Sequence, residues 1–170
     1  MKNIRIYNDY EIVRLSKSVA LEHISVITEL ANMIPLVEYT NDMILAESKE
    51  GIELFGKWDH SMIVLKKGLP IAILIAYERL NDEYYPKNSL YISELVVHNR
   101  YRRLGIASVL LETFLCIRCF NHLSGNLGFS VQTNSALWNQ YVIDMYKGFG
   151  FQEVGFKDYW NRKDVILFIN

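Results

Sequence analysis

The segment NRYRRLGIASVLL, from Asn99 to Leu111, restricts the possible folds more than any other part of the chain. Residues 90–97, directly before it, are rich in β-branched and aromatic side chains, which predicts a strand. From residue 104 to residue 120 apolar side chains recur at i, i+3, i+4 and i+7, which predicts a buried helix. The chain therefore passes from a strand to a long helix through a short turn that carries three arginines and Gly105.

A turn of this kind has the chemistry of an anion-binding site. The first amides of a helix lack intrahelical partners, and they lie at the positive end of the helix dipole. Gly105 lets a ligand approach the backbone, Ala107 is the next smallest choice, and Arg102 and Arg103 add positive charge. The chain has neither Gly-Lys-Ser/Thr nor Gly-x-Gly-x-x-Gly at this point, so the turn is not predicted to bind ATP or a dinucleotide.

The other segments alternate between helical and strand patterns. After a first strand, the order is two helices, a hairpin whose turn is Lys67-Gly68, the strand and helix described above, a strand, a helix and two closing strands. The predicted ranges are helices over 19–34, from 41 to about 55 and over 138–149, and strands over 62–65, 71–77, 128–133, 151–156 and 165–169. This order predicts one α/β (α+β) domain over residues 1–170, with a mixed sheet and helices on both faces.

Composition excludes several classes of protein. The formal net charge is −1, so the chain lacks the basic field of a nucleic-acid-binding module, which would bind DNA in a salt-sensitive way. No apolar run is long enough for a signal peptide or a membrane span, and a cytoplasmic protein without a membrane partner is expected. Cys116, Cys119 and His122 lack the second pair of ligands of a structural zinc site, so reduced thiols and no metal are predicted.

Two motifs resemble those of a known family. Arg102-x-x-Gly105-x-Ala107, after the strand YISELVV, resembles the pyrophosphate loop Arg/Gln-x-x-Gly-x-Gly/Ala of the GNAT acyltransferases, which bind acetyl-CoA. YKGFGF, from Tyr146 to Phe151, resembles the Tyr-x-x-x-Gly-Phe end of a later helix of that family. The similarity covers about residues 63–155 and implies the GNAT fold, whose sheet is splayed at the acyl-CoA site. Arg103 stands where many members have glycine, and His98-Asn99 replaces a proline common before the loop.

The resemblance implies a set of site residues. Acetyl-CoA, the expected co-substrate, would contact the strand backbone, the loop and the later helix through Leu95, Val96, Val97, Arg102, Arg103, Leu104, Gly105, Ile106, Ala107, Asn139 and Tyr146. Transfer to an amine must remove a proton from the acceptor and supply one to the departing thiolate. Glu94 suits the first task as a base, or it only binds the charge of the acceptor. Tyr146 suits the second, or it is a core tyrosine, and Tyr91 and Ser93 could share the proton path.

The predicted acceptor is a primary amine of a small molecule, attacked directly in a ternary complex. Residues 91–111 and 129–133 also look locally like the aminoglycoside 3-N-acetyltransferases, in which an acidic residue occupies the position of Glu94. An aminoglycoside or another polycation would be bound by Glu78, Asp82, Glu83, Tyr91 and Glu94. An amino sugar, an amino acid or a protein N-terminus is the alternative acceptor, and a CoA-binding sensor without turnover is the alternative function. An exposed strand edge at residues 165–169 would allow a homodimer.

Overall fold

The computed structural model of the chain describes residues 3–7, 9–35, 37–79, 89–123, 130–159 and 162–170. In residues 3–7 and 119–123 the description is limited to the backbone. None of the helices in these ranges combines the length and the apolar character needed to cross a membrane. In the same ranges, no three His, Cys, Asp or Glu side chains are grouped so that they could hold a metal ion.

The first half of the chain contains a hairpin, three short helices, a small second hairpin and a fourth helix before the central strands begin. Its elements are β1 (Asn3–Tyr7), β2 (Tyr10–Arg14), α1 (Lys17–Glu22), α2 (Ile24–Ala31), α3 (Asn41–Leu45), β3 (Ser48–Lys49), β4 (Ile52–Glu53) and α4 (Lys57–His60). The Ser16 hydroxyl caps α1 by accepting from the Val19 amide, and the Thr40 hydroxyl caps α3 by accepting from the Met43 amide.

The second half carries most of the sheet. Its elements are β5 (Met62–Lys66), β6 (Leu69–Arg79), β7 (Ser89–Val97), the 3-10 turn η1 (Asn99–Tyr101), α5 (Ile106–Leu123), β8 (Val131–Ala136), α6 (Gln140–Gly148), β9 (Gln152–Tyr159) and β10 (Arg162–Ile169). These bounds confirm the predicted hairpin, the strand before the arginine turn, the long helix after it and the order of the later elements.

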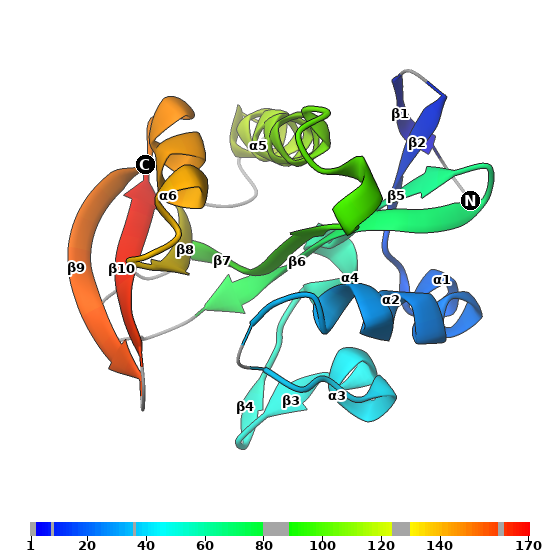
Figure 1. The fold of residues 1–170 in the computed structure, drawn as a ribbon, viewed down its shortest axis with the longest axis horizontal. Helices are drawn as coiled ribbons and strands as arrows, with labels where there is room; N and C mark the ends of the chain where they lie inside the picture. The colour runs from blue at the N-terminus through cyan, green and yellow to red at the C-terminus, as the bar shows by residue number, and fades with distance from the viewer. Residues whose placement is uncertain (1–2, 8, 36, 80–88, 124–129, 160–161) are drawn as a thin grey trace.

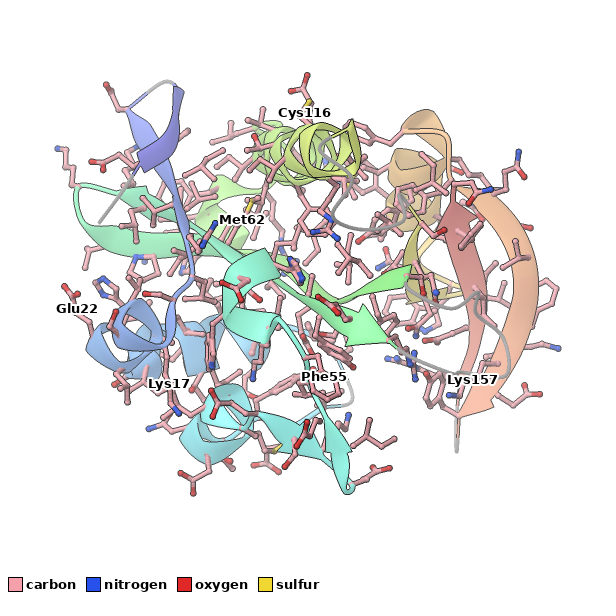
Figure 2. The ribbon with its side chains drawn as sticks, turned by 180° about the vertical axis from the view of Figure 1, so that it is seen from behind. Lys17, Glu22, Phe55, Met62, Cys116 and Lys157 are labelled. Carbon is pink, nitrogen blue, oxygen red and sulfur yellow. The ribbon has the colours of Figure 1, made fainter. Side chains whose placement is uncertain are left out.

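The large sheet has eight strands in the order β1-β2-β5-β6-β7-β8-β10-β9. All its pairings are antiparallel except β7 with β8, so the sheet is mixed, as predicted. Figure 1 shows α5 on one face and α1, α2 and α3 on the other. In Figure 2 the labelled Cys116 of α5 and Lys17 of α1 lie on opposite sides of the sheet. Each face buries its own apolar cluster, one under α5 and α6 and one under α1, α2 and α3.

The sheet opens between β7 and β8. The parallel pairing joins Leu90 to Val131, Tyr91 to Gln132 and Ile92 to Thr133, and then it stops. β7 continues to Val97 and stays paired with β6 on its other side, so residues 93–97 face β8 without pairing to it. The register between β6 and β7 shifts at Ser93, an extra residue that forms a β-bulge. The bulge and the end of the pairing together produce the expected splay.

Three local predictions were wrong. The single helix over residues 19–34 is interrupted at His23, which separates α1 from α2. The helix expected from Asn41 to about Phe55 ends at Leu45, and beyond it Glu50 and Gly51, with φ of 53° and 80°, form the turn of the β3–β4 hairpin. Residues 165–169 do not form an edge, because β10 lies between β8 and β9. A homodimer through that segment therefore has no open edge to use.

Candidate active site

The arginine turn forms an open cradle at the start of α5. Arg103 and Gly105 both adopt left-handed backbone conformations, with φ of 62° and 77°. A β-carbon built on Gly105 would meet no atom within 4 Å, so the space in front of this backbone is free. Because the first amides of a helix have no intrahelical acceptor, those that follow Gly105 are available to an anion. The turn therefore has the geometry of an anion-binding site.

Neighbouring side chains fix the shape of the cradle. The Nε of Arg102 donates to the Val97 carbonyl at 3.1 Å, which ties the turn to the end of β7. Ile106 is buried under the start of α5, whereas Leu104 is exposed. Ala107, half-buried, follows as the next small residue of the helix. The backbone is thus held by Arg102 and Ile106 while the face of the turn stays accessible.

Replacing Gly105 by Val is expected to raise the KM for acetyl-CoA at least about tenfold with a smaller effect on kcat, because the new side chain strains the turn and fills the cradle. Steady-state kinetics with varied acetyl-CoA measure this effect. Gly68→Val is a matched control, because Gly68 has a φ of 78° and open space around it but lies in the β5–β6 turn. Equal KM changes in the two variants would show that backbone strain alone is responsible.

Tyr146 reaches the sheet at the point where β7 and β8 separate. It lies on α6, is 2% exposed, and packs edge-on against Phe151 with 5.1 Å between ring centroids. Its hydroxyl hydrogen-bonds with Thr133, whose own hydroxyl donates to the Ile92 carbonyl at 3.0 Å. Thr133 and Ile92 form the last pair between β8 and β7. Burial raises the pKa of Tyr146, so the phenol stays protonated and can act as a proton donor.

Glu94 lies in the part of β7 that does not pair with β8, two residues beyond that point. Its residue is half-buried, but protein atoms enclose the carboxylate, and this desolvation raises the pKa of Glu94. The Tyr39 hydroxyl donates to Oε1 at 2.9 Å, and the Ser93 hydroxyl donates to Oε2. Both bonds, together with the charges of Lys49 and Lys57, act in the opposite direction and lower the pKa. A carboxylate in these surroundings is suited to exchange a proton.

A chain of polar contacts joins β7, β8 and β10 beside the splay. The Tyr91 hydroxyl donates to the Asn134 amide oxygen, and the Asn134 amide nitrogen donates to Asp164. Asp164 is fully buried and pairs with Arg162 through Nε–Oδ1 and Nη2–Oδ2 contacts of 2.9 Å and 3.0 Å. The guanidinium also lies 5.2 Å from the centroid of the Tyr159 ring. The two charges of this pair compensate each other, as a buried ion pair requires.

Comparison with models of known protein families identifies the family of this chain. A model of the acetyltransferase (GNAT) family matches residues 28–151, well over half of the chain. The chain belongs to the GNAT family. This acetyltransferase depends on acetyl-CoA, which is the co-substrate of the family. No curated protein sequence matches the chain.

Solved structures share the fold of the acetyltransferase at low sequence identity. Ard1 from Thermoplasma volcanium has a TM-score of 0.73 and 21% identity, covering 95% of this chain and 97% of its own. The ribosomal-protein-S18-alanine N-acetyltransferase from Escherichia coli has a TM-score of 0.69 and 13% identity, covering 94% and 92%. Arabidopsis thaliana Naa50, in complex with the bisubstrate analogue CoA-Ac-MVNAL, has a TM-score of 0.66 and 14% identity, covering 95% and 99%.

Only some of the residues predicted for the acceptor site of the acetyltransferase come together. Glu94 and Tyr91 lie on β7 beside the splay. Glu78 instead contacts the His60 ring, 3.1 Å from Oε1 to Nε2, and that ring contacts Arg118 of α5 on its other side. Asp82 and Glu83 lie outside the described residues. Asn139, the proposed pantetheine contact, is half-buried directly before α6.

Other residues of the acetyltransferase site were not predicted. Tyr39 lies in the irregular connection between α2 and α3, where no periodicity or motif marks a functional side chain. Asn134, Asp164 and Arg162 are brought to Tyr91 by the order of the strands, since β8 and β10 are neighbours although their sequences are far apart. Thr133 ends the segment GFSVQT, which predicted a strand but gave no sign of a partner for Tyr146.

Proposed function

We propose that the protein transfers the acetyl group of acetyl-CoA to a primary amine by direct attack in a ternary complex. The neutral amine attacks the thioester carbonyl carbon, a C–N bond forms, and the C–S bond breaks. The proton of the acceptor nitrogen passes to Glu94, and the leaving thiolate takes the proton of the Tyr146 phenol. Re-equilibration with solvent returns both groups to their starting states.

The observation that carries this proposal is the position of the two side chains at the splay. Tyr146 is hydrogen-bonded to Thr133, the last residue of β8 that pairs with β7, and Glu94 lies in the adjoining part of β7 that does not pair with β8. The free edge of residues 93–97, including Leu95, Val96 and Val97, offers backbone groups to the pantetheine arm in the manner of an added strand. The Arg102–Ala107 turn, which follows β7 directly, would hold the phosphates of the same molecule.

The charges at the splay favour an acceptor that carries one ammonium group there. A polycation such as an aminoglycoside was expected to meet Glu78, Asp82, Glu83 and Glu94, but Glu78 contacts His60, and Asp82 and Glu83 lie outside the described residues. Among the described residues of that expected set, Glu94 is the carboxylate that lies at the splay. An amino acid or the N-terminus of a peptide fits this arrangement better than a polycation does. The similar structures include Naa50 with the bisubstrate analogue CoA-Ac-MVNAL and a ribosomal-protein-S18-alanine N-acetyltransferase, which supports the same acceptor class.

The test is thiol release from acetyl-CoA with five classes of acceptor: aminoglycosides, polyamines, amino sugars, amino acids and short peptides. Turnover of peptides or amino acids at a kcat/KM at least about tenfold above that of the polycations is expected, a difference of about 1.4 kcal/mol in transition-state binding. A higher kcat/KM for the polycations than for peptides and amino acids would instead support a polycationic acceptor. Tight binding of CoA without turnover of any class would indicate a sensor.

A further inference from the structure

Tyr39 connects the helical layer to Glu94 of the sheet. The residue lies between α2 and α3, 55 positions before Glu94, and its hydroxyl donates to Glu94 Oε1 at 2.9 Å. Ser93, the bulged residue of β7, donates to the other oxygen. Each carboxylate oxygen has two lone pairs, so both oxygens can still accept a further hydrogen bond. Glu94 is therefore oriented by two donors without being blocked.

The backbone of Tyr39 is fixed independently of Glu94. The Asn32 side chain, at the end of α2, accepts from the Tyr39 amide at 2.6 Å and donates to the Tyr39 carbonyl at 3.1 Å. The next residue, Thr40, caps α3, and the Thr28 hydroxyl donates to Asn41 at 2.7 Å, which joins α2 to α3. The backbone of Tyr39 is thus held by its own connection, and it does not depend on the bond to Glu94 for its position.

The environment makes Tyr39 a permanent donor. Burial and the neighbouring Glu94 raise the pKa of Tyr39, so the phenol keeps its proton. The positive charges of Lys49 of β3 and Lys57 of α4 lower the pKa of Glu94. Arg162 of β10 lowers the pKa of Tyr39, and Tyr77 of β6 raises it. Lys57 is itself held by the Ile44 and Ala46 carbonyls at 2.8 Å and 2.5 Å, and burial lowers its pKa to about 8.

We propose that Tyr39 is a positioning residue of the acetyl transfer, whose hydrogen bond to Glu94 Oε1 stabilises the ionised form of the carboxylate. The inference rests on the proposed role of Glu94 as the base. Desolvation alone would favour the protonated form of Glu94, which cannot take a proton from an amine. A donor that cannot itself ionise offsets this effect at every pH at which the enzyme works.

The experiment is the pH profile of kcat/KM for the parent and for Tyr39→Phe, with the best acceptor of the amine panel. Without the hydroxyl, Glu94 ionises at higher pH, so the acidic limb of the profile moves upward. On that limb kcat/KM is expected to fall about tenfold relative to the parent, and above it the two proteins are expected to agree within about twofold. Tyr10→Phe is the matched control, because it removes a phenol hydroxyl on β2, away from the splay.

A second measurement does not depend on turnover. The side-chain carboxyl carbon of Glu94, assigned by its absence in Glu94→Gln, is titrated by ¹³C NMR in the parent and in Tyr39→Phe. A midpoint at higher pH in Tyr39→Phe supports the inference even if no acceptor is turned over, in which case only the proposed function fails. Superimposable titrations, or a kcat/KM lowered by one factor at every pH, would overturn the inference and leave the proposed function intact.

Discussion

Glu94→Gln is expected to lower kcat by about 10²-fold to 10⁴-fold, the contribution of one well-placed general base. The amide oxygen can keep the hydrogen bond from Tyr39, and the Ser93 hydroxyl can accept from the amide nitrogen, so the fold is retained. Acetyl-CoA should bind with unchanged affinity, because its cradle lies at the start of α5. Steady-state kinetics and equilibrium binding of CoA separate the two quantities.

The same variant changes the pH dependence in a defined direction. Burial raises the pKa of Glu94, and the protonated form cannot accept a proton, so kcat/KM of the parent falls as the pH decreases through that pKa. Glu94→Gln should lose this acidic limb. Glu29→Gln, an exposed site on α2, serves as the control and should keep both the rate and the limb. If Glu94→Gln raised the KM for the amine and left kcat and the limb unchanged, Glu94 would bind the acceptor without acting as the base.

The sequence predicted best those parts of the fold whose signals are local. The strand of residues 90–97 and the helix from 104 to 120 show periodicity within one segment, and β7 and α5 match them closely. The helix predicted after Asn41 was wrong because α3 is ended by contacts from elsewhere. Lys57, twelve residues beyond Leu45, donates to the Ile44 and Ala46 carbonyls at the end of α3. The Glu50-Gly51 pair was the available sign of a turn at this place.

The residues of the candidate site divide in the same way, into those marked by a local sequence signal and those brought together by tertiary packing. Glu94, Tyr146 and the Arg102–Ala107 turn were predicted from motifs that lie within continuous segments, and the structure brings Glu94 and Tyr146 to the splay. The contacts that control Glu94 come from Tyr39 and Lys57, which reach it only through the packing of the helical layer on the sheet. Glu78 illustrates the opposite case, since its acidic side chain suggested acceptor binding but the fold places it against His60.

Tyr146→Phe is expected to lower kcat by a similar factor, about 10²-fold to 10⁴-fold, through loss of the proton donor to the leaving thiolate. The phenylalanine ring keeps the edge-on contact with Phe151, and the lost hydrogen bond to Thr133 should cost about 1 kcal/mol of stability. Thermal unfolding measured beside the kinetics shows whether the protein is still folded at the assay temperature.

The pH profile distinguishes this variant from Glu94→Gln. Burial raises the pKa of Tyr146, so the phenol is protonated throughout the neutral range, and its removal should lower kcat by the same factor at every pH from about 6 to 9. The acidic limb set by Glu94 should remain. Thr133→Val, which removes the partner but keeps the phenol, should have a smaller effect on kcat. Equal losses in Thr133→Val and Tyr146→Phe would mean that the orientation of the ring matters and that its proton does not.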